Sequence, residues 1–129
     1  MTDLGTRIRR KLLFSPFRTV AIDDQRSWRG IVMWMLVQHI ARAIRERTDA
    51  PRVGVMLPTS GLFPAALLAA WSAGRTAVPL NYLLSPDDLD YVARDAGLDT
   101  IITVGPMIDF VGSGLRWMAT RAMSPWSLL

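Results

Sequence analysis

Short apolar runs alternate with segments of helical periodicity along most of the chain. Four runs rich in β-branched or apolar residues predict strands over residues 19–22, 52–57, 76–80 and 100–104. Between them, apolar residues recur three and four positions apart, which predicts amphipathic helices over 27–47, 62–73 and 85–96. Strands that alternate with helices are typical of a parallel sheet. We therefore expect an α/β fold of short parallel strands in the order βαβαβαβ.

Residues suited to helix ends support this division. Ser85 is a predicted N-cap, and Pro86 stands at the first helical position, where its missing N–H has no partner to lose. Leu84 and Leu89 flank this start at the spacing of a hydrophobic staple. Ser27 is the predicted N-cap of the helix over 27–47.

Composition limits the class of protein. A chain of 129 residues is about one domain. Half of its residues are apolar and 20% are charged, which excludes a disordered chain. There is no cysteine, so disulfides, thiolate metal sites and cysteine nucleophiles are excluded.

The formal net charge is +4, and its densest part is a basic lead over residues 1–18 that holds Arg7, Arg9, Arg10 and Lys11. Such a run suits phosphate or an anionic membrane, and also the solvated end of a helix. No aromatic residues interleave the run from Arg7 to Lys11, so we expect no nucleic-acid partner. The apolar stretch over 12–17 is too short for a secretory signal, and we expect a cytoplasmic protein, with peripheral membrane contact as the alternative.

The amino-acid sequence of the central segments resembles that of a known family. Residues 52–84 read RVGVMLPTSGLFPAALLAAWSAGRTAVPLNYLL, which resembles the strand, turn, alanine-rich helix and Val-Pro-Leu-Asn turn of the AMP-forming acyl-CoA and acyl-carrier-protein synthetases, the adenylate-forming (ANL) superfamily. Residues 85–103 are similar to the helix and strand that follow there, and Ser27-Trp28 is similar to an earlier element. The resemblance implies a partial N-terminal domain over 19–112, incomplete relative to the family, and a divergent tail over 113–129.

The resemblance also implies an activity. Members of this family join a carboxylic acid, often a fatty acid, to ATP as an acyl-adenylate with release of pyrophosphate. The acyl group then passes to coenzyme A or a carrier-protein thiol. Their phosphate loop, adenine and Mg²⁺ motif, ribose-binding aspartate and C-terminal lysine match no position in this chain. We therefore assign no catalytic, cofactor-binding or metal residue and expect the chain to be inactive alone.

One glycine-containing segment invites comparison with a phosphate loop. Gly112, Ser113 and Gly114 are followed by Leu115 and Arg116, whereas such a loop opens a helix with a lysine. We interpret the segment as a turn. Because the resemblance fades there, our hypothesis is a frameshift or gene truncation near Gly112, which translation of the flanking DNA in all frames would test.

Other residues that could support chemistry have simpler explanations. His39 is the only histidine, and on an amphipathic helix we expect it to be structural. Asp23 and Asp24 could pose as a carboxylate pair, but adjacent residues leaving a strand favour a turn.

An acidic cluster and a long uncharged stretch remain. Asp87, Asp88 and Asp90 lack the loop spacing of a calcium site, and helix capping explains two of them. Residues 54–74 carry no charge, but Pro58 and Pro64 argue against a membrane-spanning helix. Two hypotheses follow, an inactive ligase fragment that self-associates through uncovered apolar faces, and a small membrane-associated or partner-binding protein without catalysis.

Overall fold

The computed structural model describes residues 3–24, 26–105, 107 and 122–123. Its main sheet is parallel and has the strand order β4-β3-β5-β6. The strands are β3 (Arg52–Val55), β4 (Thr76–Pro79), β5 (Ile101–Ile102) and β6 (Ala122–Met123). This arrangement confirms the predicted α/β class.

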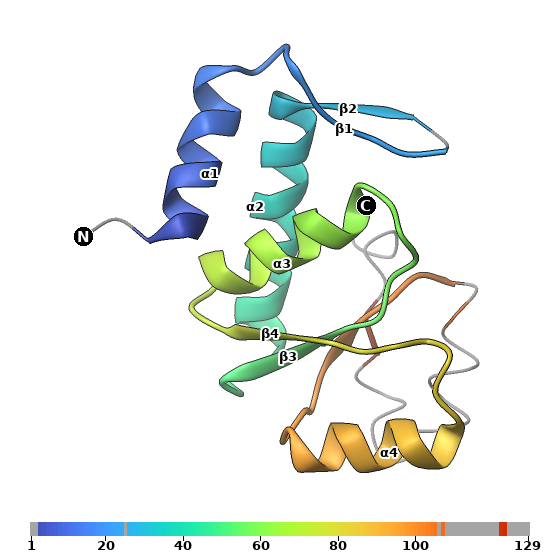
Figure 1. Cartoon of the computed structure of the whole chain (residues 1–129). Helices are drawn as coiled ribbons and strands as arrows, with labels where there is room; N and C mark the ends of the chain where they lie inside the picture. Colours follow the sequence, from blue (N-terminus) through green and yellow to red (C-terminus); the bar gives the residue numbers. More distant parts are fainter. Residues whose placement is uncertain (1–2, 25, 106, 108–121, 124–129) are drawn as a thin grey trace.

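Helices cover both faces of the sheet (Figure 1). They are α1 (Leu4–Phe14), α2 (Gly30–Arg47), α3 (Leu62–Ser72) and α4 (Pro86–Asp95). One apolar cluster joins α2 and α3 to Val53 and Val55, and a second joins α4 to Met56 and Ile101. The two clusters lie on opposite faces because successive strand residues point to opposite sides.

The structure corrects the place of the first strand. β1 (Thr19–Ile22) pairs antiparallel with β2 (Ser27–Arg29) in a separate two-stranded sheet instead of joining the parallel one. A short turn can connect antiparallel strands, whereas parallel strands need a long crossover. Only residues 23–26 separate β1 from β2, so the chain has to fold back on itself as a hairpin.

The predicted N-cap at Ser27 is wrong for the same reason. Ser27 lies in β2, and α2 begins at Gly30 after Arg29, which provides no side-chain cap. Backbone carbonyls replace the cap, because the amide of Gly30 donates to Arg18 (2.9 Å) and that of Ile31 to Pro16 (2.8 Å). A Cβ on Gly30 would lie 2.6 Å from the Ser15 carbonyl oxygen, so this close approach requires glycine.

The predicted start of α4 is confirmed. The Ser85 hydroxyl accepts a hydrogen bond from the backbone amide of Asp88 at 3.2 Å, and Pro86 opens the helix. Leu89 is buried, and Leu84 packs against the same cluster. Local sequence fixes this helix end because all of its partners lie within a few residues.

The basic lead contains a helix. α1 buries Leu12 against the core, and Ile8 packs beside it, whereas Arg7, Arg10 and Lys11 are exposed. The N-cap of α1 is Asp3, whose carboxylate accepts from the amide of Thr6 at 2.8 Å. Within the described part of the chain, no helix combines the length and apolar character needed to cross a membrane.

Candidate functional site

A cleft of about 590 Å³ opens where the strands of the parallel sheet end. Pro58, Thr59 and Ser60 come from the turn after β3, Tyr82 follows β4, and Val104 follows β5. The remaining lining residues are Asp23, Asp24, Arg26, Trp28, Leu62 and Met107. Ligands of open α/β sheets bind outside the carboxyl ends of the strands, so this cleft is the candidate site.

Asp23 ties the β1–β2 hairpin to the turn after β3. Its carboxylate accepts hydrogen bonds from the Trp28 indole Nε1 at 2.7 Å and from the Gly61 amide at 2.9 Å. It also accepts from the amide of Arg26 at 2.9 Å, which closes the hairpin turn. Trp28 is only 3% exposed, so its indole N–H needs this partner. Asp23 therefore holds one wall of the cleft against the other.

The same carboxylate occupies the N-terminus of α3. Helix N-termini that follow a parallel strand attract phosphate, because their free amides and the helix dipole favour negative charge. Here Asp23 accepts from Gly61, and the Ser60 hydroxyl accepts from the amide of Leu62 at 3.3 Å. A side chain of the protein itself thus fills the place that a phosphate would take.

The charged groups of the cleft do not suit a polyphosphate. Among the described residues that line the cleft, Asp23 and Asp24 contribute two carboxylates and Arg26 contributes the one cationic group. The Arg26 guanidinium stacks over the Trp28 ring, 4.2 Å from its centroid. A triphosphate needs several free amides and an excess of cationic charge. The charges of this cleft are therefore poorly suited to a triphosphate.

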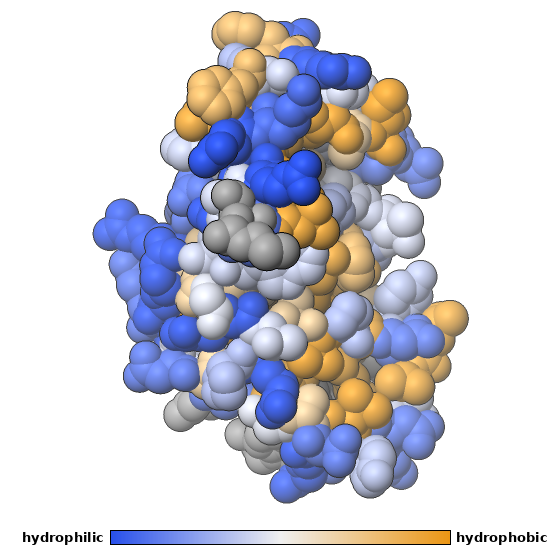
Figure 2. Space-filling model, turned by 60° about the vertical axis from the view of Figure 1, so that its left-hand side comes forward, coloured by the Kyte–Doolittle hydropathy of each residue, from blue (hydrophilic) through white to orange (hydrophobic). Residues whose placement is uncertain are grey.

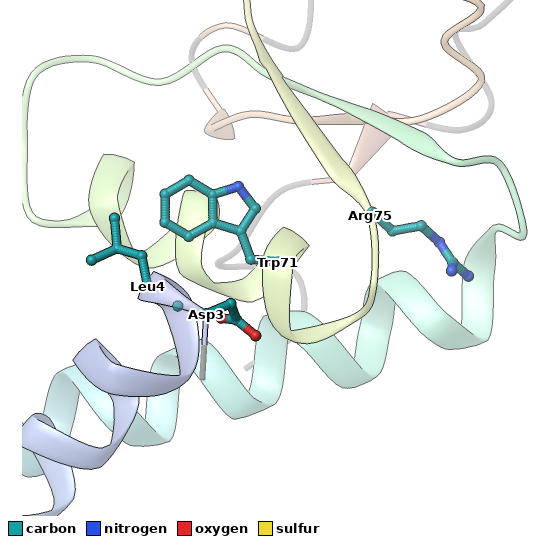
Figure 3. A pocket seen from close by; sticks show the side chains of 5 residues that line it. Asp3, Leu4, Trp71 and Arg75 are labelled. Atoms are coloured by element: carbon teal, nitrogen blue, oxygen red, sulfur yellow. The ribbon is translucent and has the colours of Figure 1, made fainter. Parts of the chain in front are cut away.

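A second hollow lies between the start of α1 and the end of α3 (Figure 3). Trp71 and Leu4 form its apolar side, and the Arg75 side chain extends away from them. The Arg75 guanidinium donates to the Thr48 carbonyl at 2.9 Å, and the Asp3 carboxylate caps α1. Its charged groups are thus engaged elsewhere and do not converge on a ligand.

The structure separates the other residues with candidate chemistry. His39 is half-buried on α2. Asp88 accepts from Ser85 at 2.7 Å, and Asp90 forms an ion pair with Arg94 at 3.0 Å. Among the described residues, no three histidine or carboxylate side chains gather as metal ligands. The segment 112–114 lies outside the described residues.

Sequence reasoning missed the role of Asp23. Asp23 and Asp24 were expected to form a polar turn, and Asp23 does accept the turn amide of Arg26. Its bond to Gly61, however, joins positions that are 38 residues apart. Two features of the sequence could have indicated this bond. Trp28 needs a hydrogen-bond acceptor if its ring is buried, and the helix that starts after Gly61 has no capping side chain at that position.

Comparisons with known proteins agree with this fold. A family model described as AMP-binding enzyme matches residues 12–124. The N-terminal domain of FACL13 from Mycobacterium tuberculosis superimposes with a TM-score of 0.84 at 20% identity, over 99% of this chain and 34% of that domain. A benzoate CoA ligase from Burkholderia xenovorans LB400 gives 0.83 at 21% identity, over 96% of this chain and 25% of the ligase.

A fatty acyl CoA synthetase from Mycobacterium tuberculosis is also similar, with a TM-score of 0.79 and 19% identity over 95% of this chain and 26% of the synthetase. No curated protein matches the chain. The chain spans about a third or less of the length of these solved relatives, and at such identities they show the fold. Because the family model covers nearly all of its residues, this chain belongs to the AMP-binding enzyme family.

Proposed function

We propose that the chain forms part of the N-terminal framework of an AMP-forming acyl-activating ligase and is inactive alone. The overall reaction joins a carboxylic acid to ATP as an acyl-adenylate, with loss of pyrophosphate, and then transfers the acyl group to a thiol with loss of AMP. The observation that carries the proposal is the family match over residues 12–124, together with a parallel sheet that superimposes on acyl-CoA ligases.

The solved relatives also suggest a class of substrate, which we propose for this chain. One of them is named for benzoate and another for fatty acyl groups, so the shared chemistry is a carboxylic acid with an apolar body. We assign fatty acids to this chain because apolar side chains such as Leu62, Val104 and Met107 line its cleft. ATP, Mg²⁺ and coenzyme A or a carrier-protein thiol serve the complete ligase, and we place the protein in the cytoplasm, where these partners are abundant.

Inactivity of the chain alone rests on the geometry of the cleft. The α3 N-terminus is filled by the Asp23 carboxylate, and Arg26, the one cation among the described lining residues, stacks on the Trp28 indole. An added triphosphate would meet two carboxylates at short range, which is repulsive in a partly desolvated site. On this proposal the described residues supply a scaffold and leave nucleotide binding to other parts of the ligase.

The first test is carboxylate-dependent ATP–pyrophosphate exchange by the purified chain. A panel of benzoate and fatty acids is offered, with the benzoate CoA ligase as positive control and a mock preparation as background. We expect exchange equal to the mock. Exchange above the mock that depends on the acid would contradict the inactivity and the absence of a nucleotide site.

The second test asks whether the framework serves a ligase. DNA downstream of the coding sequence is translated in all frames and searched for a Ser/Thr/Gly-rich loop that ends in Lys-Gly. The product encoded there is expressed with and without the chain. We expect exchange only when both are present. Two outcomes would count against the proposal. One is a downstream sequence without such a loop in any frame, and the other is ATP–pyrophosphate exchange that is equal with and without the chain.

We further propose that the isolated chain self-associates around α4. Leu83 and Tyr91 are 79% and 70% exposed, and Tyr82, which precedes Leu83, is 44% exposed. Large apolar side chains on a small domain favour association. Sedimentation velocity should show a concentration-dependent dimer or larger species that Leu83→Ser with Tyr91→Ser dissolves. A monomer at every accessible concentration would refute this part.

A further inference from the structure

Five large apolar side chains are exposed at the end of the molecule formed by the α1 C-terminus and the β1–β2 hairpin. We call this group the apolar tip. Its exposed fractions are 47% for Leu13, 76% for Phe14, 76% for Phe17, 40% for Val20 and 78% for Ile22. In Figure 2, apolar and hydrophilic side chains alternate over the upper end of the molecule, where Figure 1 places these elements.

The backbone explains why these residues point outward. α1 uses Ile8 and Leu12 to pack on the core, which leaves the neighbouring Leu13 and Phe14 on its outer side. In β1, Ala21 packs against the core opposite Trp28, so the residues before and after it face away. The apolar tip is thus the outer surface of elements whose inner surface is already buried.

Cationic side chains surround the apolar tip. The segment from Leu4 to Ile22 contains no acidic residue. Arg10 and Lys11 are exposed one turn before the tip on α1, Arg18 follows Phe17, and Arg29 is exposed on β2. The turn of the hairpin carries two acidic residues, Asp23, which is bonded inward to Gly61, and Asp24.

We propose that this end of the protein docks on an anionic lipid bilayer, with the phenylalanines in the interfacial region and the cations on the headgroups. Interfacial segments combine an aromatic and aliphatic face with lysine and arginine beside it. Each cation near an anionic leaflet adds electrostatic attraction. A second copy of the chain fits less well, because it would bring two clusters of like charge together.

The docking step needs no catalysis, so it is independent of the proposed ligase role. It assigns to the chain a surface that presents the sheet and cleft beside a membrane. An acid with an apolar body partitions into bilayers. A ligase framework held there would therefore meet its substrate at the lipid surface, which is a reason for such a surface to exist on this fold.

Flotation of the full chain with vesicles tests the proposal. Phosphatidylcholine vesicles that contain roughly a quarter phosphatidylglycerol are compared with pure phosphatidylcholine at about 0.1 M salt. We expect binding to the anionic vesicles and at least roughly tenfold weaker binding to the neutral ones. Equal binding to both would overturn the charge part of the proposal.

Two double variants separate the contributions. Phe14→Ser with Phe17→Ser should weaken binding by roughly tenfold or more, because two exposed rings no longer enter the interface. Arg10→Ala with Lys11→Ala should weaken binding to anionic vesicles only. The matched controls are Met35→Ser, which removes an exposed apolar side chain from α2, and Arg45→Ala with Arg47→Ala, which removes cations from the end of α2. Both should bind like the parent chain.

Three results would overturn the proposal. One is unchanged binding after loss of both phenylalanines, which would indicate adsorption by charge alone. Another is an equal effect of the control variants. The third is an oligomer in lipid-free sedimentation that the phenylalanine variant dissolves, which would assign the apolar tip to a second copy. Circular dichroism of each variant confirms that the helices are intact, as expected for substitutions at exposed positions.

Discussion

The hydroxyl of Thr48 donates a hydrogen bond to the carboxylate of Asp99 at 2.7 Å, between residues 51 positions apart in the sequence. The same hydroxyl accepts from the amide of Ala50 at 3.0 Å. Thr48 is 6% exposed and directly follows α2, and Asp99 lies just before β5. This pair joins the C-terminal end of α2 to the segment before β5. It lies at the amino ends of the parallel strands, opposite the cleft.

Thr48→Val should lower the free energy of unfolding by about 1 kcal/mol, because it preserves side-chain shape but removes one donor to the Asp99 carboxylate and the acceptor of the part-buried Ala50 amide. Urea denaturation followed by circular dichroism measures the change. Thr19→Val, at an exposed strand position, is the control and should shift stability by less than about 0.5 kcal/mol. Equal effects at both positions would show that the Thr48–Asp99 pair contributes nothing of its own.

Asp23→Ala should lower the free energy of unfolding by about 2 kcal/mol or more, because the Trp28 indole N–H and the Gly61 amide both lose a charged acceptor. Asp23→Asn retains one acceptor oxygen and should cost less. Asp24→Asn removes an exposed carboxylate in the same turn and should be nearly neutral. Denaturant midpoints of the three variants give the ranking, and a reversed order would mean that Asp23 does not hold the hairpin on α3.

Gly61→Ala should destabilise the protein by about 2 kcal/mol or more, because a Cβ there would overlap the indole of Trp28. The ring cannot move without losing its bond to Asp23. Gly105→Ala is the matched control, since a Cβ at that position meets no atom within 4 Å. Thermal unfolding should separate the two variants by several degrees. A normal melting temperature for Gly61→Ala would show that the hairpin does not press on this helix start.

Acidification should loosen the start of α1. The pKa of Asp3 lies below the usual 3.8, chiefly because its carboxylate accepts from the Thr6 amide and also from the Thr6 hydroxyl. A carboxyl whose pKa is lower in the folded state stabilises that state fully above its unfolded pKa. This contribution is lost as the pH falls through the lowered value.

The amide shift of Thr6 in an NMR titration reports this step, and its midpoint should fall below pH 3.8. In Asp3→Asn the step should vanish, because the amide side chain does not titrate. A midpoint at or above 3.8 would mean that the cap is not formed in solution.

Sequence reasoning succeeded where the determinants are local. Ser85, Pro86 and Leu89 act within one turn of each other, and the helix they predict is present. It failed at Ser27, because the acceptors that replace a cap come from the carbonyls of Pro16 and Arg18. A serine before a helical pattern cannot reveal that the segment is needed as the second strand of a hairpin.

The candidate site was less predictable than the fold. Its shape depends on strand ends that meet only after the sheet has assembled, and on the bond from Asp23 to Gly61 across 38 residues. The absence of a matched phosphate loop was visible in the sequence. The carboxylate of Asp23 at the α3 N-terminus was not predicted from the sequence. Hydrophobic periodicity shows which face of a helix or strand is buried, but it does not show which distant residue will bond to the end of a helix.

The strand order has a consequence for folding during synthesis on the ribosome. β3 lies inside the sheet between β4 and β5, although it precedes both along the chain. A chain made from its N-terminus therefore releases Val53 and Val55 from the ribosome before either flanking strand exists. Until then these valines lack the two strands that later flank them, so we expect the parallel sheet to assemble only after β4 and β5 have been synthesised.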